Sequence, residues 1–583
     1  MKFSHRCSRF LTVALLLATV ISSFYLPAYA QSSNAIKYEE YVAIPAPDGT
    51  KLAASLAMPD REGKFSTVII RSPYGSRKSR GYVESYAKRG YACIVQDTRG
   101  QYDSEGVFDP FVTGVEDGDA TLKWVRSQPW SNGKIGASGH SYVGFTALYL
   151  AAGEAEPPDA IVVHNPVASP VGGLYRGGAM IHHFDYYWSL LVDYKEIDLD
   201  YIFSLDWDNL FGLLPLADAH RGVNREVKHY RNWVEWANGS FGKGILPDPA
   251  QISGDKTAFL LVGGWFDLFH RDVINLFNQL SRDSSKEKVK LIIGPYDHSQ
   301  SPPPESDMEF GEWSTLNVSS LREQWLDRWV LDKENGADKR PAVEFFLLGE
   351  NRWISSDTWP PANVSKRSFY LHSKGSANSS NGDGRLDESK SKNEPFDQYI
   401  YDPGDPVPTK GGILCCLRRM TKAGPMDQSS IEKRNDVLVY TTDILTEDIT
   451  VAGPVELELF ASTSARDTDF TGKLVDVYPD GKALNITDGI IRARFRNGIG
   501  EPQFITSNKV EHYRIELGHT AITFRKGHRI RLEVSSSNFP RFDRNMNTGG
   551  TIGTESKFKK AEQKVYHDKK RLSRLILPVL EKM

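Results

Sequence analysis

The fold of this chain is decided by one stretch, Gly139-His140-Ser141-Tyr142-Val143-Gly144. It follows a short strand-like run at 134–138 and leads into residues 145–152, which form helices readily. A serine between a strand and a helix is typical of a nucleophile elbow, whose strained turn needs small neighbouring residues. The two glycines meet that need, although the second follows the serine by three positions instead of the usual two. We therefore predict Ser141 as a catalytic nucleophile.

Short apolar runs on both sides of this stretch predict a parallel β-sheet. The runs are nearly continuous and rich in β-branched residues, and helical patterns such as 116–126 separate them. A sheet with helices on both faces has strands of this kind. Residues 36–57 alternate polar and apolar positions, which indicates a β-hairpin before the sheet. The predicted parallel strands lie at 66–71, 91–97, 160–164, 258–262 and 289–293.

Two later regions have a different pattern. From His183 to Trp236, within 171–250, aromatic residues and leucines recur at helical spacing. We interpret this region as a helical cap over the carboxyl edge of the sheet, with ordinary core packing as the alternative for its aromatic side chains. From Ala342 to the C-terminus, segments of alternating polarity separated by Gly and Pro predict an antiparallel β-sandwich or jelly roll.

An aspartate and a histidine follow two of the later strands, where catalytic partners for Ser141 are needed. A serine hydroxyl needs a general base and an acid that orients the base. In sheets of this type the partners follow in the order serine, acid, histidine. Asp267 comes just after the strand at 258–262, and His298 just after the strand at 289–293. We predict these residues as a catalytic triad with Ser141, and Asp297 is the alternative acid.

Two tyrosines are candidates for the donors that stabilise the oxyanion. The backbone N–H of Tyr142, directly after the nucleophile, is the first expected donor. A second donor normally comes from the loop after an early strand, here 71–75, which lacks the glycine-rich pattern that presents a backbone N–H. Tyr74 in this loop offers a phenolic O–H instead. The alternative for its side chain is packing against the cap.

Residues 1–30 are predicted to be a secretory signal peptide. Basic residues precede an apolar stretch at 10–26, and Ala28-Tyr29-Ala30 forms a small-x-small cleavage site. An uncleaved membrane anchor is the alternative. No other apolar run approaches the ~20 residues that a membrane span needs. The expected location is therefore secreted or periplasmic, with cleavage after Ala30.

The composition and the histidine and cysteine residues do not indicate a nucleic-acid, metal or cofactor ligand. The chain is 40% hydrophobic and 25% charged, and its formal net charge of -3 gives no reason to expect nucleic acid. His182 and His183 are adjacent and point in different directions on a helix, so we predict no metal and no cofactor. Cys415 and Cys416 are adjacent and are not expected to bridge each other. The sequence does not indicate an oligomeric state.

Taken together, these segments resemble the cocaine esterase-like (CocE/NonD) serine hydrolases. That family is related to the S15 Xaa-Pro dipeptidyl-peptidases, the α-amino-acid ester hydrolases and the glutaryl-cephalosporin acylases. The likeness extends over most of the chain after the predicted signal peptide. It includes RSPY at 71–74, QDTRG at 96–100, SEG at 104–106, GHSYVG at 139–144, GGWFD at 263–267, GPYDH at 294–298, YDPGDPVPT at 401–409, TSARDTDF at 463–470 and SSSNFPR at 535–541.

The resemblance implies an α/β-hydrolase fold with an inserted helical cap, followed by an all-β jelly-roll domain. It also implies Ser141, Asp267 and His298 as the triad, and the Tyr74 O–H with the Tyr142 N–H as the oxyanion hole. We expect the α/β-hydrolase domain at 31–170 and 251–338, the cap at 171–250 and the β-domain at 339–583.

The predicted activity is hydrolysis of an ester or amide in a small molecule or short peptide, with a carboxylic ester preferred. The related α-amino-acid ester hydrolases bind a substrate amine with carboxylates beside the nucleophile. Val143 occupies the elbow position where the resemblance would place such an acid, which argues against amine substrates. Asp185 and Glu196 in the cap keep that alternative open. The alternatives are therefore an Xaa-Pro dipeptidyl-peptidase and, from another class, a carbohydrate-binding protein whose hydrolase domain is inert.

Overall fold

The first part of the chain is built on one mixed sheet, in a computed structural model that describes residues 35–417 and 422–581. Its ten strands lie in the order β1-β2-β4-β3-β5-β6-β9-β10-β11-β12. The seven strands from β4 to β11 in this order run parallel to one another, and the pairs β2–β4 and β11–β12 are antiparallel. The strands are β1 (Ile36–Pro45), β2 (Lys51–Pro59), β3 (Phe65–Ser72), β4 (Ala92–Asp97), β5 (Ser131–His140), β6 (Ala160–His164), β9 (Ala258–Gly264), β10 (Val289–Gly294), β11 (Val343–Leu347) and β12 (Arg352–Ser356).

Alternate strand residues face two apolar layers, because successive side chains of a strand point to opposite faces. Leu261 and Ile293 point into one apolar layer, whereas Leu260 and Ile292 point into the other. We call the ten-stranded sheet together with the helices that cover its two faces the sheet domain. The first layer lies against α2 (Gly114–Ser127), α3 (Ser141–Leu148) and α10 (His270–Asp283), and the second against α1 (Arg80–Lys88) and α11 (Val318–Val330).

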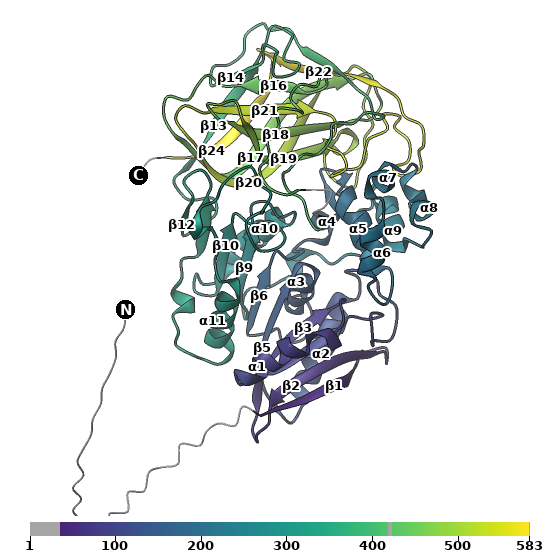
Figure 1. Cartoon of the computed structure of the whole chain (residues 1–583), viewed down its shortest axis with the longest axis vertical. Helices are drawn as coiled ribbons and strands as arrows, with labels where there is room; N and C mark the ends of the chain where they lie inside the picture. The colour runs from purple at the N-terminus through teal and green to yellow at the C-terminus, as the bar shows by residue number, and fades with distance from the viewer. Residues whose placement is uncertain (1–34, 418–421, 582–583) are drawn as a thin grey trace, which may run out of the picture.

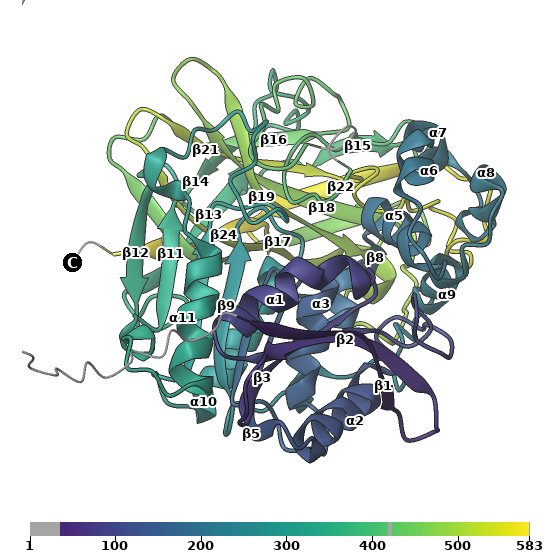
Figure 2. The same cartoon turned by 60° about the horizontal axis from the view of Figure 1, so that its bottom comes forward.

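The helical cap is confirmed as a helical region between β6 and β9. It holds α4 (Pro170–Leu174), the short ribbon β7 (Tyr175–Arg176) and β8 (Ala179–Met180), α5 (His182–Val192), α6 (Leu199–Ser204), α7 (Trp207–Gly212), α8 (His220–Val223) and α9 (Lys228–Trp236). Figure 1 and Figure 2 both show α5 to α9 grouped at one side of the molecule. The aromatic residues of this region also pack into a core, as Trp188 stacks on Trp233 at a ring distance of 5.6 Å.

The C-terminal part is all-β, as predicted, and Figure 1 shows it above the sheet domain. Its strands, which form one twelve-stranded sheet, are β13 (Val364–His372), β14 (Arg385–Asp387), β15 (Asp397–Tyr401), β16 (Leu438–Thr441), β17 (Ile449–Thr463), β18 (Asp469–Val477), β19 (Ala483–Arg492), β20 (Glu511–Phe524), β21 (Arg529–Ser535), β22 (Ala561–Asp568), β23 (Arg571–Leu572) and β24 (Arg574–Leu580). We call this unit the β-domain.

The sheet domain extends beyond the predicted boundary at 338. β11 pairs in parallel with β10, Leu291 opposite Val343, and β12 completes the edge of the same sheet. Strands that follow residue 342 were expected in the β-domain because they alternate in polarity like those that come later. Parallel pairing with β10 depends on contacts between distant segments, so the alternation alone could not reveal it.

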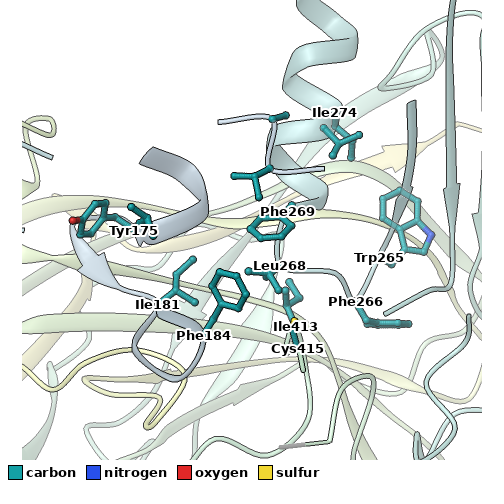
Figure 3. Packing of buried hydrophobic residues seen from close by; sticks show 14 of the residues in the cluster. Tyr175, Ile181, Phe184, Trp265, Phe266, Leu268, Phe269, Ile274, Ile413 and Cys415 are labelled. Carbon is teal, nitrogen blue, oxygen red and sulfur yellow. The ribbon is translucent and has the colours of Figure 1, made fainter. Parts of the chain in front are cut away.

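Cap, sheet domain and β-domain meet beside the end of β9. Figure 3 shows Phe184 of α5, Phe269, which follows β9, and Ile413 of the β-domain as members of one buried hydrophobic cluster. The two phenylalanine rings are 5.6 Å apart and nearly perpendicular. This packing joins the loop after β9 to both neighbouring units, which fixes the position of that loop. The predicted signal peptide lies outside the described residues, and within them no helix is both long and apolar enough to cross a membrane.

Candidate active site

A strained turn joins β5 to α3 at Ser141. Its φ of 58° lies in the left-handed region, which is uncommon for a residue other than glycine. A Cβ atom at Gly139 would overlap the carbonyl of Val143, and one at Gly144 would lie 2.7 Å from Cβ of Pro166. The glycines are therefore needed for close packing around the serine. The close approach of Pro166 explains why residue 144 is a glycine.

The structure brings Ser141, His298 and Asp267 together at the carboxyl edge of the sheet. Nε2 of His298 lies 2.9 Å from Oγ of Ser141, and its Nδ1 lies 2.5 Å from Oδ2 of Asp267. Asp267 is fully buried, and its Oδ1 accepts a hydrogen bond from the backbone N–H of Phe269 at 2.8 Å. In the neutral histidine, a proton on Nδ1 leaves Nε2 free to accept the serine hydroxyl. This arrangement can activate a serine nucleophile.

Asp297, the alternative acid, holds the loop that carries His298. Its Oδ1 accepts a hydrogen bond from the N–H of Ser299 at 2.8 Å, and its carbonyl accepts one from Nδ2 of Asn165 at 3.0 Å. The contact of His298 is with Asp267. Asn165 follows β6, so its bond also joins the loop after β10 to the neighbouring strand.

His140, which the sequence analysis did not select, supports His298 from inside the elbow. Its Nε2 lies 2.9 Å from the carbonyl oxygen of His298, and the two rings are 4.6 Å apart. Burial is the main cause that holds the pKa of His140 well below its usual range, so the ring is neutral and can donate one N–H to that carbonyl. The residue occupies a variable position of the elbow motif, which gave no sign of this role.

Two candidate oxyanion donors lie near the serine. Tyr74 follows β3 and lines the same cavity as Ser141, and Nε1 of Trp188 donates a hydrogen bond to its hydroxyl oxygen at 3.3 Å. Burial raises the pKa of Tyr74 to about 12, so the phenol keeps its proton and can donate it to an anion. The N–H of Tyr142 belongs to the first turn of α3 and has no partner within the helix. Trp188 was missed because only its spatial position, not its place in the aromatic cap, indicates this contact.

Ser141 and His298 open onto a cavity of about 380 Å³. Side chains of α5 in the cap, among them Phe184, Tyr187 and Trp188, form part of its wall. No aspartate or glutamate is among the described residues that line it. The cavity can therefore receive an uncharged or anionic group more readily than a cationic one.

The two cap acids considered as amine ligands lie elsewhere. Asp185 is fully buried away from this cavity, and neither of its carboxylate oxygens has a hydrogen-bond partner in the described part of the chain. Burial raises its pKa well above the usual range. Glu196 is exposed and does not line the cavity. Neither residue is in position to bind an amine next to Ser141.

Cys415 and Cys416 form a disulfide beside the cavity, so the expectation that they do not bridge was wrong. Their Cα atoms are 3.7 Å apart, and the left-handed φ of 77° at Cys416 turns the backbone between them. In the described part of the chain they also form, with His298, the one group whose potential metal-ligand atoms lie within 4.8 Å of one another. Thiolates bind metals, and the disulfide provides none.

The chain matches two family models. One, X-Pro dipeptidyl-peptidase (S15 family), covers residues 48–300, and the other, X-Pro dipeptidyl-peptidase C-terminal non-catalytic domain, covers residues 335–576. Over 580 residues the chain is 33% identical to the cocaine esterase of Rhodococcus sp. (strain MB1 Bresler), a match that spans 93% of this chain and 98% of that protein. Relatives of this kind are hydrolases.

Two solved structures have the same arrangement of domains. An α-amino acid ester hydrolase and an aminopeptidase from the marine sediment archaeon Thaumarchaeota archaeon each superpose with a TM-score of 0.79 at 24% identity. Each match covers 96% of this chain, and it covers 100% of the first structure and 99% of the second. These matches confirm the predicted α/β-hydrolase fold.

Proposed function

Because the chain belongs to the cocaine esterase-like family of serine hydrolases, we propose that it hydrolyses carboxylic esters through an acyl-enzyme on Ser141. The observation that carries this proposal is the series of hydrogen bonds from Ser141 to His298 and from His298 to Asp267. These bonds support a nucleophile, a general base and an orienting acid in the roles that ester hydrolysis requires.

The proposed reaction has two acyl-transfer steps. Oγ of Ser141 bonds to the ester carbonyl carbon while Nε2 of His298 takes the hydroxyl proton. The ester C–O bond then breaks, and the alcohol leaves with the proton that His298 returns. Water, deprotonated by the same nitrogen, attacks the acyl-enzyme and releases the acid. The Tyr74 hydroxyl and the Tyr142 N–H stabilise the negative oxygen of both tetrahedral intermediates.

An ester is preferred over an X-Pro peptide because of the charges around the cavity. An exopeptidase that removes dipeptides must bind the ammonium group of the peptide N-terminus, which needs carbonyl or carboxylate acceptors. No carboxylate is found among the described residues that line the cavity, and His140, His164 and Arg322 line it instead. This lining favours a substrate without a positive charge.

We also propose that residues 1–30 direct export to the periplasm or the medium and are removed. Expression with the complete N-terminus tests this. The exported protein is expected to begin at Gln31, as measured by intact mass. Retention of residues 1–30 in a membrane fraction would support the anchor instead.

A substrate panel with the purified protein tests the proposed activity. We expect turnover of p-nitrophenyl acyl esters to exceed that of Gly-Pro-p-nitroanilide, and Ser141→Ala to lower ester turnover by on the order of 10⁶-fold. Ser127→Ala, an exposed serine at the end of α2, is the matched control. Turnover of the anilide alone would favour the exopeptidase. Equal activity of wild type and Ser141→Ala would leave the non-catalytic, carbohydrate-binding alternative.

A further inference from the structure

One cationic side chain in the cavity wall has no acidic partner among the residues that the structure describes. Arg322 of α11 lines the same cavity as Ser141. It makes no hydrogen bond or ion pair with a described residue, and its Nε is buried without a partner. Its guanidinium carbon lies 5.3 Å from the ring centre of Tyr82. Arg322 is half-buried, and a guanidinium that is partly removed from water without an anion is less favourable than a paired one, so an anionic ligand would complete its surroundings.

The acids nearest to Arg322 along α11 are already paired with another arginine. Glu323 and Asp327 accept hydrogen bonds from Arg89 at 2.7 Å and 2.9 Å. Asp327 also pairs with Lys333 at 3.0 Å. These contacts leave no acid of the helix to neutralise Arg322.

A buried histidine with two unused ring nitrogens lines the same cavity. His164 ends β6 and is 3% exposed, and neither of its ring nitrogens has a hydrogen-bond partner within residues 35–417 and 422–581. Burial, with a smaller effect from the charge of Arg322, lowers its pKa to about 3. The ring is therefore neutral at pH 7 and carries one N–H that it can donate to a ligand.

Hydroxyl groups complete this part of the wall. Tyr82 and Ser138 line the cavity near Arg322 and His164, and the Tyr82 hydroxyl lies 3.3 Å from that of Tyr86. We call Arg322, His164, Tyr82 and Ser138 the donor arm. It combines one full positive charge with uncharged donors and, among the described residues, no carboxylate, which is the chemistry that binds a carboxylate.

We propose that the donor arm binds a carboxylate carried by the substrate, so that the preferred substrates are anionic esters. The inference rests on the proposed esterase activity, because it assigns a substrate class to the site of Ser141. The carboxylate has two possible sources, the acyl part, as in a half-ester of a dicarboxylic acid, or the alcohol part, as in an ester of a hydroxy acid. Both would place the anion at Arg322 while the ester carbonyl reaches Ser141.

Steady-state kinetics with matched esters test the proposal. The acyl-side substrates are monophenyl esters of dicarboxylic acids of increasing length, each compared with the phenyl alkanoate of the same length. The alcohol-side substrates are butyrate esters of hydroxybenzoic acids, each compared with the corresponding hydroxybenzamide ester. For at least one pair, kcat/KM of the anionic ester should exceed that of its neutral match by roughly 10- to 100-fold, as for a hydrogen bond to a charged group.

Variants of Arg322 assign the preference to the donor arm. Arg322→Gln should lower the ratio of anionic to neutral kcat/KM by roughly 10- to 100-fold, mainly through KM, and Arg322→Lys should retain part of the ratio. Arg328→Gln on the same helix is the matched control, since Arg328 pairs with Asp338 at 3.1 Å outside the cavity. Its ratio should equal that of wild type.

The outcomes separate this inference from the proposed activity. If neutral esters are hydrolysed but no anionic ester is preferred, or Arg322→Gln keeps the ratio, the inference is wrong and the esterase activity stands. If no ester is hydrolysed faster than by Ser141→Ala, the proposed activity itself fails. Should Arg322→Gln not fold, inhibition of wild type decides. Glutarate must then inhibit neutral-ester hydrolysis more strongly than glutaramide, and equal inhibition overturns the proposal.

Discussion

Two buried or half-buried arginines have opposite surroundings in this protein. In the β-domain, Arg492 is 1% exposed and lies 2.9 Å from Asp469 and 3.0 Å from Asp543. At the cavity beside Ser141, Arg322 has no acidic partner among the described residues. The first arginine is neutralised by its own domain, whereas the second is not. From this comparison we infer that buried charges with an oppositely charged partner stabilise the fold, whereas a charge at the cavity without such a partner is available to bind a ligand.

The same contrast holds for other buried groups of the two regions. In the β-domain, Arg494 pairs with Asp467 at 2.7 Å, and Lys473 pairs with Glu533 at 2.9 Å. At the cavity, the ring of His164 has no hydrogen-bond partner among the described residues, and among these residues the hydroxyl of Tyr74 accepts a hydrogen bond from Trp188 but donates none. Substitutions should therefore lower stability in the β-domain and lower activity at the cavity.

Asp267→Asn should produce the largest effect of this set, and on activity alone. An asparagine amide can donate to Nδ1 of His298, which would move the ring proton to Nε2 and prevent that atom from accepting the proton of Ser141. We expect kcat for a p-nitrophenyl ester to fall by about 10⁴-fold. The urea midpoint should remain close to wild type. A loss below tenfold would mean that Asp267 does not orient the base.

Arg492→Met should lower the stability of the protein and leave its activity unchanged. Removing the cation leaves Asp469 and Asp543 as neighbouring buried acids, which costs about 3–5 kcal/mol of unfolding free energy. Lys366→Met is the control, because its pair with Glu456 is exposed and should contribute less than about 1 kcal/mol. Urea unfolding measures both. Ester turnover per folded molecule should match wild type, and equal stability of the two variants would contradict the comparison.

Tyr74→Phe should lower kcat without a large change in stability. The phenyl ring keeps the packing near Trp188 but removes the hydroxyl that is expected to donate to the oxyanion. Loss of one such donor lowers kcat by roughly 10²- to 10³-fold. Tyr194→Phe in the cap, whose hydroxyl donates to the carbonyl of Glu226, is the matched control. If both variants had wild-type kcat, Tyr142 would need a different partner as the second donor.

The sequence predicted the features that depend on local pattern. β9 and β10 are short apolar runs, so the positions of Asp267 and His298 just beyond them could be inferred before their geometry was known. The elbow was equally local, because Gly139 is required by the carbonyl four residues later. Motifs at strand ends are informative since parallel strands bring their carboxyl ends to one edge.

Features that depend on distant contacts could not be predicted in this way. The pairing of β11 with β10 requires the register of two segments about fifty residues apart. Trp188 contacts Tyr74 only once the cap lies against the sheet domain. In the sequence, Arg322 cannot be distinguished from the other cationic residues of α11. That none of the described acids lies beside Arg322 is a property of the assembled cavity.

His182 extends the comparison to histidines and should give the smallest effect. Unlike His164, it uses both ring nitrogens: Nε2 lies 3.2 Å from the carbonyl of Phe211, and Nδ1 lies 2.8 Å from the hydroxyl of Tyr230. Burial lowers its pKa to about 4. The unfolded chain, with an ordinary histidine pKa of about 6.5, therefore binds a proton between pH 6.5 and 4 that the folded chain does not. Stability from this residue is present above pH 6.5 and is lost as the pH falls through that window.

His182→Gln removes this titration. Between pH 7 and pH 5, wild type should lose about 2 kcal/mol more unfolding free energy than the variant. Urea unfolding of both proteins at each pH measures this difference. Buried acids such as Asp193, whose pKa burial raises to about 7, have the opposite effect on stability as the pH falls. Because these acids are present in both proteins, their effect cancels when the two are compared. An identical pH dependence would show that His182 titrates normally despite its burial. Burial would then not be enough to keep a histidine neutral, and the neutral state assigned to His164 at the cavity would lose its basis as well.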